Sequence, residues 1–134
     1  MKIVYAYVAG DIIHEGHILF LQNAKNLGNK LIVGVLTDSA IMEKKKKPAI
    51  SFKERYRIVQ SLKFVDCTVP QNEYSPINNL KAIQPDILVE STSHIGNSYL
   101  KQLKKVFKGR IIMFPYYSEN SSTKIKDKIK NGGE

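Results

Sequence analysis

The sequence predicts an α/β protein built on a doubly wound parallel sheet. Short runs rich in Val and Ile recur along the chain, and segments with the apolar spacing of helices separate them. Strands that alternate with helices imply parallel pairing through right-handed crossovers. We therefore expect a five-stranded sheet in the order 3-2-1-4-5, with helices on both faces and a ligand crevice at the carboxyl ends of the strands. The expected strands cover residues 3–8, 31–36, 65–69, 87–89 and 111–114.

Capping signals place the helices between these strands. The first helix is expected to start near Gly16 and to end at Gly28, because glycine favours helix ends. Ser51 and Glu54 form an S-x-x-E capping box, which predicts the start of the next full helix. Further helices are predicted after Ser75-Pro76, over residues 98–107, and after Ser121-Ser122-Thr123.

Length and composition limit the class of protein. A chain of 134 residues fits one domain, which we expect to cover residues 1–134. No apolar run approaches the ~18 residues that a membrane span needs, and the N-terminal run continues into a Gly-Asp turn instead of a signal-peptide cleavage site. The single cysteine, Cys67, cannot form an intrachain disulfide, and its apolar neighbours predict a half-buried strand position. We therefore expect a soluble, cytoplasmic protein without a membrane partner.

The net charge of +9 indicates an anionic partner but does not identify it. Nucleic acid, an anionic membrane surface and a small polyanionic substrate would all suit a basic protein. Much of the excess lies in residues 44–47 and in the lysines of residues 124–130, and such runs are commonly solvated surface. Because few aromatic residues lie among these lysines, binding of nucleic acid ranks last among the interpretations.

The most informative segment is Gly10-Asp11-Ile12-Ile13-His14-Glu15-Gly16-His17, between the first expected strand and the first expected helix. Doubly wound sheets bind phosphate at this point, because a helix N-terminus offers unpaired N–H groups and about half a positive charge. Gly16 lets a phosphate approach the backbone, and the imidazoles of His14 and His17 can point to one side. There they could donate hydrogen bonds to phosphate oxygens as charge develops. A structural zinc site is disfavoured, because His94 and one cysteine are the only further ligands of that kind.

The segment from His14 to His17 has the form H-x-G-H, and on this motif the chain resembles the cytidylyltransferase-like superfamily of nucleotidyltransferases. The resemblance covers nearly the whole chain, and it implies a Rossmann-like fold. It extends to the glycerol-3-phosphate cytidylyltransferases and, more closely, to the cytidylyltransferase domains of phosphonate biosynthesis. The further segments that carry it are Gly34-Val35-Leu36-Thr37-Asp38, Ser51-Phe52-Lys53-Glu54-Arg55, Ser121-Ser122-Thr123-Lys124-Ile125 and Pro115-Tyr116.

The resemblance implies roles for residues of these motifs. In the family the two histidines lie beside the triphosphate and stabilise the transition state, and lysines after the second strand face the phosphates. Shaping of the turn is the favoured role for Asp11, with a Mg²⁺-linked role as the alternative. Helix capping remains an equal alternative for Ser122 and Thr123. The implied catalytic residues are His14, His17 and Lys46, and the implied nucleotide-binding residues are Val8, Ala9, Gly10, Asp11, Gly16, Lys44, Arg55, Ser121, Ser122 and Thr123.

Departures from the glycerol-3-phosphate enzymes concern the acceptor. Tyr116 replaces an arginine of those enzymes, and Lys63 replaces another, which keeps the charge but loses the bidentate fork. Where they have Gly-Asp-Asp-Trp, this chain has Glu90-Ser91-Thr92-Ser93-His94, so we expect a rebuilt pocket. In this pocket Glu90 and His94 could bind an amine or a hydroxyl of the acceptor, although a loop histidine is more often a surface residue. The implied acceptor-binding residues are Lys63, Glu90, His94 and Tyr116.

Together these features imply an enzyme that transfers CMP from CTP to a phosphonate or phosphorylated small-molecule acceptor and releases pyrophosphate. Mg²⁺ would arrive with CTP, and no metal site made by the protein alone is expected. The resemblance also implies a homodimer. Three alternatives stay open: a glycerol-3-phosphate cytidylyltransferase, an adenylyltransferase of the same superfamily, and a protein that binds nucleotide or nucleic acid without catalysis.

Overall fold

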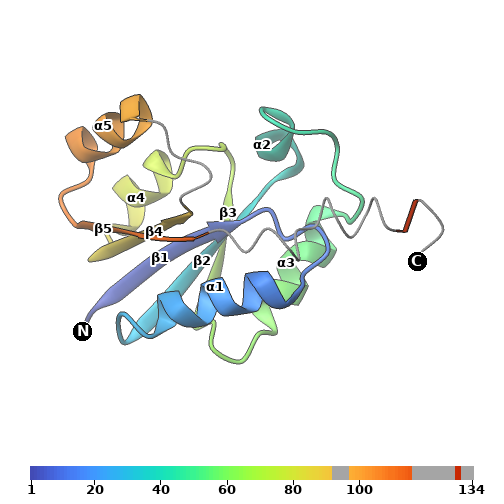
Figure 1. The fold of residues 1–134 in the computed structure, drawn as a ribbon, viewed down its shortest axis with the longest axis horizontal. Helices are drawn as coiled ribbons and strands as arrows, with labels where there is room; N and C mark the ends of the chain where they lie inside the picture. The colour runs from blue at the N-terminus through green and yellow to red at the C-terminus, as the bar shows by residue number, and fades with distance from the viewer. Residues whose placement is uncertain (92–96, 116–128, 131–134) are drawn as a thin grey trace.

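The computed structural model describes residues 1–91, 97–115 and 129–130, and its strands form one five-stranded parallel sheet (Figure 1). The strand order is β3-β2-β1-β4-β5, and every neighbouring pair is parallel. The predicted fold class and strand order are therefore confirmed. The elements are β1 (Ile3–Val8), α1 (Glu15–Lys25), β2 (Lys30–Leu36), α2 (Asp38–Met42), α3 (Phe52–Gln60), β3 (Cys67–Gln71), α4 (Ile77–Ile83), β4 (Ile87–Ser91), α5 (Asn97–Val106) and β5 (Arg110–Phe114).

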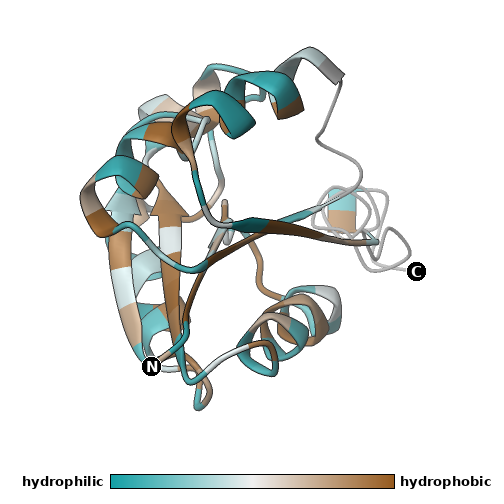
Figure 2. Cartoon of the chain, turned by 90° about the vertical axis from the view of Figure 1, so that its left-hand side faces the viewer, coloured by the Kyte–Doolittle hydropathy of each residue, from teal (hydrophilic) through white to brown (hydrophobic). Residues whose placement is uncertain are grey.

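Helices cover both faces of the sheet, so the central strands are apolar on both sides (Figure 2). On one face, Leu21 of α1 and Val59 of α3 share a buried cluster with Val33 of β2. On the other face, Leu80 of α4 and Leu103 of α5 pack against β1 and β4. Each fully buried side chain of this kind stabilises the fold by roughly 1.5–3 kcal/mol. All the helices in the described ranges are too short or too polar to cross a membrane.

The short helix α2 was not predicted. Its N-cap is Thr37, whose Oγ1 accepts a hydrogen bond from the backbone N–H of Ala40 at 3.2 Å. Ala40 and Ile41 pack against Leu36 at the end of β2. A helix of five residues contains too few apolar positions for a helical period to be recognised. This helix nevertheless matters for the site, because it carries the lysine run away from the carboxyl end of β2.

Two predicted helix starts were displaced by one residue. The first helix begins at Glu15 with His14 as its N-cap, because the His14 side chain accepts a backbone hydrogen bond. In α4, Pro76 is the N-cap and the hydroxyl of Ser75 accepts from the N–H of Ile77 at 3.3 Å. The predicted cap of α3 is confirmed by the bond from the N–H of Glu54 to Ser51 Oγ at 3.3 Å. The helix predicted after Ser121 starts outside the described residues.

The third strand begins two residues later than predicted, at Cys67. Asp66 closes the preceding turn, because its N–H donates to the carbonyl of Leu31 at 3.0 Å. Its carboxylate accepts in return from the N–H of Leu31 at 2.8 Å. Val65 is still part of the turn, since its N–H donates to the carbonyl of Leu62. The half-buried position predicted for Cys67 is confirmed.

Candidate active site

The loop between β1 and α1 contains two left-handed backbone conformations. Gly10 has φ 75°, which glycine adopts without penalty. Ile12 has φ 63°, and a β-branched side chain is strained there by roughly 1–3 kcal/mol. Such strain persists only where neighbouring contacts fix the backbone. The predicted phosphate-binding loop is therefore held in a defined shape.

Asp11 supplies part of that constraint. Its side chain is buried, and its two carboxylate oxygens accept hydrogen bonds from the N–H groups of Ala49 at 3.0 Å and Ile50 at 2.9 Å. The loop after β1 is thereby tied to the segment that leads into α3. These bonds support the turn-shaping role over a direct role in metal binding. Within the described ranges, no group of three or more His, Cys, Asp or Glu side chains could hold a metal ion.

The two motif histidines cap the start of α1 reciprocally. His14 Nδ1 accepts a hydrogen bond from the N–H of Gly16 at 3.0 Å, and His17 Nδ1 accepts from the N–H of His14 at 3.2 Å. Their ring centroids lie 4.1 Å apart. Because Nδ1 is an acceptor in both rings, the proton of each neutral imidazole is on Nε2. The structure thus brings together the two histidines that the sequence predicted to act together.

Both imidazoles are neutral near pH 7. Burial lowers the pKa of His14. The pKa of His17 is lowered to about 4, mainly by burial and further by the neighbouring His14 and the charge of Lys45. His14 Nε2 is buried and has no hydrogen-bond partner among the described residues. An unpaired buried donor costs roughly 1–3 kcal/mol. A phosphate oxygen at this point would accept the bond that Nε2 lacks.

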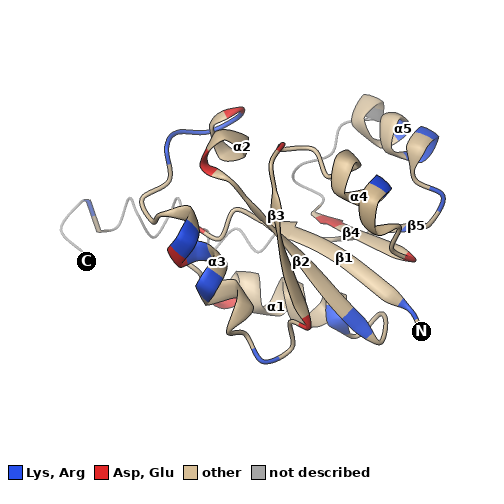
Figure 3. Cartoon of the chain, turned by 180° about the vertical axis from the view of Figure 1, so that it is seen from behind, with Lys and Arg blue, Asp and Glu red and all other residues tan. Residues whose placement is uncertain are grey.

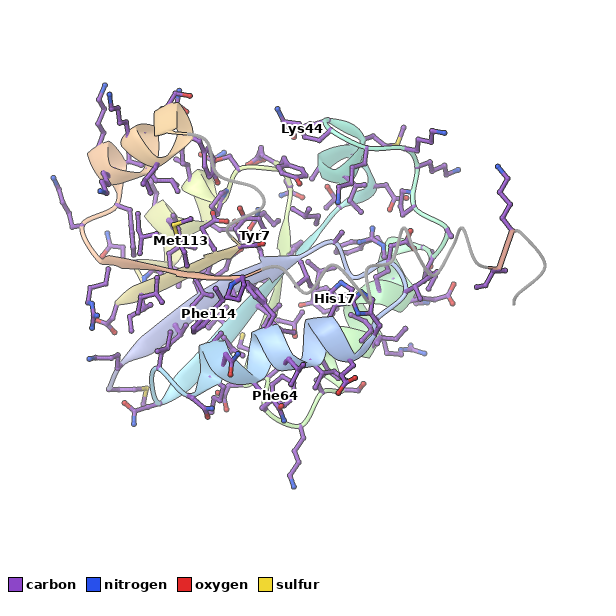
Figure 4. The ribbon with its side chains drawn as sticks, in the orientation of Figure 1. Tyr7, His17, Lys44, Phe64, Met113 and Phe114 are labelled. Atoms are coloured by element: carbon purple, nitrogen blue, oxygen red, sulfur yellow. The ribbon has the colours of Figure 1, made fainter. Side chains whose placement is uncertain are left out.

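The lysines of residues 44–47 follow α2 and are all exposed. Figure 4 shows Lys44 beside α2, well away from His17 at the start of α1. Lys45 was not singled out by the sequence analysis, yet its charge is the one in this run that contributes to the lowered pKa of His17. Four identical residues in a row give no signal about which of them faces the site. The phosphate-binding roles of Lys44 and Lys46 stay predictions.

Arg55 has a different place from the one predicted. Its side chain has no exposed surface, so its guanidinium is not available to a nucleotide in this structure. Its Nε donates to the carbonyl of Ile50 at 3.0 Å. Its Nη1 donates to the carbonyls of Ala9 and Leu36, at 2.5 and 2.6 Å. Its Nη2 donates to Asp38 Oδ1 at 2.6 Å. The predicted nucleotide contact is therefore corrected to a positioning role. Arg55 joins the ends of β1 and β2 to the start of α2.

Lys63 lies away from the expected acceptor crevice, and its acceptor-binding role stays a prediction. Lys63 lies in the turn between α3 and β3, where Asp66 bonds to Leu31 at the beginning of β2. Helix α3 runs antiparallel to the strands, so its end carries Lys63 to the amino edge of the sheet. Figure 4 shows the neighbouring Phe64 on the far side of α1 from Tyr7. Within this chain Lys63 therefore does not reach the crevice at the carboxyl edge.

Glu90 lies at the carboxyl edge, as predicted, but it is 1% exposed. The hydroxyl of Tyr7 donates to its two carboxylate oxygens at 2.8 and 2.7 Å, and the hydroxyl of Tyr99 donates to Oε2 at 3.2 Å. Neither tyrosine was identified from the sequence, because each also fits an apolar position of its own strand or helix. Burial raises the pKa of Glu90 to about 7 despite these bonds. His94, Tyr116, Ser121, Ser122 and Thr123 lie outside the described residues.

The raised pKa of Glu90 predicts a pH-dependent effect of Glu90→Gln on stability. The folded protein holds this proton more tightly than the unfolded chain, where the pKa has its ordinary value of 4.5, so ionisation of Glu90 destabilises the fold as pH rises from 4.5 through 7. Two and a half pH units correspond to about 3 kcal/mol. The measured quantity is the free energy of unfolding of Glu90→Gln minus that of the parent, from urea unfolding. It should increase by about 3 kcal/mol between pH 4.5 and pH 8.

A matched change at an exposed carboxylate is the control for this measurement. Glu54→Gln, on the exposed side of α3, should shift the stability difference little over the same pH range. A Glu90→Gln difference that is independent of pH would show that Glu90 does not titrate near 7.

Two neutral imidazole donors lie at a helix start, at the carboxyl edge of a doubly wound sheet, and this is the arrangement expected of a nucleotidyltransferase. Comparison with known proteins agrees, because the model of the family described as cytidylyltransferase-like matches residues 11–128. The chain belongs to this cytidylyltransferase-like family of nucleotidyltransferases.

Individual relatives show how far the likeness extends. The chain is 34% identical over 122 residues to the bifunctional protein HldE of Campylobacter fetus subsp. fetus, covering 90% of this chain and 26% of that protein. It is 37% identical over 132 residues to HldE of Helicobacter pylori strain J99, covering 96% and 28% respectively. The chain thus spans about a quarter of the length of the curated relatives it matches. A lipopolysaccharide core biosynthesis protein from Thermoplasma volcanium GSS1 superposes with a TM-score of 0.79 at 28% identity, covering 87% of this chain and 98% of that one.

Proposed function

We propose that this protein transfers CMP from CTP to a small acceptor that carries a phosphonate or phosphate group. An acceptor oxygen attacks the α-phosphorus, an O–P bond forms, the bond between the α-phosphorus and the bridging oxygen breaks, and pyrophosphate leaves with that oxygen. The acceptor oxygen is already ionised near neutral pH, so no strong general base is needed. Mg²⁺ enters as part of the nucleotide substrate, bound mainly by phosphate oxygens.

The observation that carries the proposal is the buried Nε2–H of His14 beside His17, which finds no hydrogen-bond partner among the residues that the structure describes. Two neutral donors fixed by backbone hydrogen bonds need no reorganisation when charge develops on the phosphate oxygens. The start of α1 adds the partial positive charge of a helix N-terminus. Lys45 and its neighbouring lysines supply mobile cations for the triphosphate.

A second candidate is transfer of AMP from ATP to a phosphorylated sugar. The likeness to a lipopolysaccharide core biosynthesis protein favours a sugar phosphate as the acceptor. The same two histidines would serve either nucleotide, since they face the phosphates and not the base. The cytoplasmic location and the homodimer remain predictions under both candidates.

Pyrophosphate release from CTP, ATP, GTP and UTP, with Mg²⁺, distinguishes the two candidates. The acceptor panel comprises alkylphosphonates, phosphorylated alcohols and phosphorylated sugars. We expect release with CTP and a phosphonate or a small phosphate ester. Release with ATP and a phosphorylated sugar would instead establish the second candidate.

Mass spectrometry of the product is needed alongside this assay. A nucleotide joined to the acceptor through a diphosphate-type linkage is expected, whereas simple hydrolysis would yield free CMP. Tight, strongly salt-dependent binding of RNA or DNA without any pyrophosphate release would favour the non-catalytic alternative.

A further inference from the structure

The lysine run, residues 44–47, is anchored to helix α2 at its start. The N–H groups of Lys44 and Lys45 donate to the carbonyl of Ile41 at 3.1 and 2.9 Å. The side chain of Ile41 is buried in one cluster with Leu36 at the end of β2. The backbone of the run therefore leaves α2 in a defined direction.

Asp11 and Arg55 hold the other end of the run. The N–H groups of Ala49 and Ile50 donate to the two carboxylate oxygens of Asp11 at 3.0 and 2.9 Å. The carbonyl of Ile50 accepts from Arg55 Nε at 3.0 Å, and Nη2 of the same guanidinium bonds to the first residue of α2. Residues 46–48 span the short distance between the two anchored ends.

Asp11 also belongs to the loop that carries the histidine pair. It lies three residues before His14 and next to Ile12, whose left-handed backbone is strained. Its buried carboxylate therefore joins the β1–α1 loop to the end of the lysine run. Figure 3 shows the basic segment after α2 passing toward α3.

The charge of one lysine of the run acts at the histidine pair. Lys45 contributes to the lowered pKa of His17, after burial and the neighbouring His14. The interaction between two charges weakens with distance and with exposure to salt solution. The side chain of Lys45 is exposed, so its effect on His17 depends on how firmly the backbone of the run is held.

We propose that Asp11 is a positioning residue, which holds the lysine run beside the β1–α1 loop and so directs Lys45 toward phosphates bound there. The task of the lysine rests on the proposed function, whereas the placement of the run does not. Asp11 acts on Lys45 through the backbone of residues 49–50. The same two bonds fix the turn that leads to His14.

An NMR titration of the histidines in the intact protein tests this placement without turnover. Asp11→Asn keeps the size of the side chain but leaves one acceptor oxygen for two N–H groups. Release of the run moves Lys45 away, and the pKa of His17 then rises. Loss of the charge of Asp11 by itself would lower this pKa, because a nearby carboxylate favours a protonated imidazole. A rise would support the inference, and an unchanged or lower pKa would overturn it.

Lys45→Gln measures the full effect of that charge on the pKa of His17. The rise should be at least as large as in Asp11→Asn, and the double variant should titrate like Lys45→Gln alone. Additive rises would overturn the inference, because Asp11 would then act on His17 by another route.

Asp66→Asn is the matched control for Asp11→Asn. This carboxylate also accepts a backbone N–H, from Leu31 at 2.8 Å, but it lies at the amino edge of the sheet. Its substitution should leave the pKa of His17 unchanged. An equal rise in this control would indicate general loosening of the fold and would overturn the inference.

Ala49→Pro is a second variant that changes no charge. It removes one of the two N–H groups that Asp11 accepts, so the pKa of His17 should again rise. An unchanged pKa in this variant would overturn the inference even if Asp11→Asn did not fold.

Trypsin, which cuts after lysine, reports the release of the run directly. Cleavage after residues 44–46 should be about tenfold faster in Asp11→Asn than in Asp66→Asn, because an N–H left without an acceptor weakens the anchored end. Equal cleavage rates would count against the anchoring by Asp11 and overturn the inference.

Pyrophosphate release separates this inference from the proposed function. Asp11→Asn should lower kcat/KM for CTP in the parent protein and should lose most of its effect when Lys45 is already glutamine. Equal losses in the two backgrounds would overturn the role of Asp11 in directing Lys45. If the NMR and trypsin results show release while the parent protein transfers no nucleotide, the placement stands and only the proposed reaction fails.

Discussion

Substituting either motif histidine so that its Nε2–H donor is lost should lower turnover by about 100- to 1,000-fold, with a much smaller change in nucleotide affinity. Suitable variants are His14→Asn and His17→Gln. The donors act on charge that develops during substitution at phosphorus, so their loss raises the barrier more than it weakens binding. The measurement is kcat and KM for CTP from pyrophosphate release with a saturating acceptor.

These two substitutions keep the helix cap and replace the imidazole Nε2–H by an amide N–H in a different position. Asparagine is a good N-cap residue, because its side-chain oxygen can accept a hydrogen bond from the N–H of Gly16. Glutamine suits the third helical position, which His17 occupies in the capping box. His14→Ala also loses the cap and should be about 1 kcal/mol less stable. If His14→Asn is as stable as the parent and as inactive as His14→Ala, the loss is catalytic. Parental turnover in both His14→Ala and His17→Ala, which have no side-chain donor, would refute the role of the histidines.

Replacing Arg55 by methionine should destabilise the fold by about 3–5 kcal/mol. The substitution leaves the carbonyls of Ala9 and Leu36 without their donor, and it leaves Asp38 without its cation. The cation–π contact with Phe52, at 5.6 Å from the ring centroid, is lost as well. Urea unfolding measures the loss of stability. CTP affinity should fall with it, because the carbonyl of Ala9 precedes the phosphate-binding loop.

An exposed arginine on the same helix is the control. Arg57→Met should change stability by no more than about 0.5 kcal/mol. Arg55→Lys keeps the charge but replaces a planar fork with one ammonium group, so its stability should lie between those of the parent and Arg55→Met. If Arg55→Met unfolds at the same urea concentration as Arg57→Met, the buried guanidinium does not hold these strand ends together.

Local sequence signals predicted the histidines well, because the relevant geometry is local. His14, Gly16 and His17 interact within one helical turn, and a cap of that kind depends on spacing alone. The same reasoning explains the confirmed cap at Ser51. The displaced starts of α1 and α4 show the limit of these signals, because a side-chain cap moves a boundary by one residue without changing the pattern.

Lys63 lies away from the expected crevice for a topological reason. A basic residue near the end of a helix matches the family pattern in sequence, but the pattern does not state which edge of the sheet the residue reaches. The antiparallel course of α3 decides this point. A resemblance that places a residue in the right motif can therefore still misplace it in the site of a single chain.

The sequence by itself determined the fold class, the five strands and the paired histidines at the start of α1. These features follow from periodicity, capping and local spacing, which each involve residues close together in the chain. Only the tertiary structure decided that Arg55 is buried, that the charge of Lys45 acts on the pKa of His17, and that Tyr7 and Tyr99 bond to Glu90. The bond from Arg55 to Ala9 spans 46 positions, and that from Tyr7 to Glu90 spans 83. Such contacts depend on the strand order and register, which bring distant residues to one edge of the sheet, and no local pattern records them.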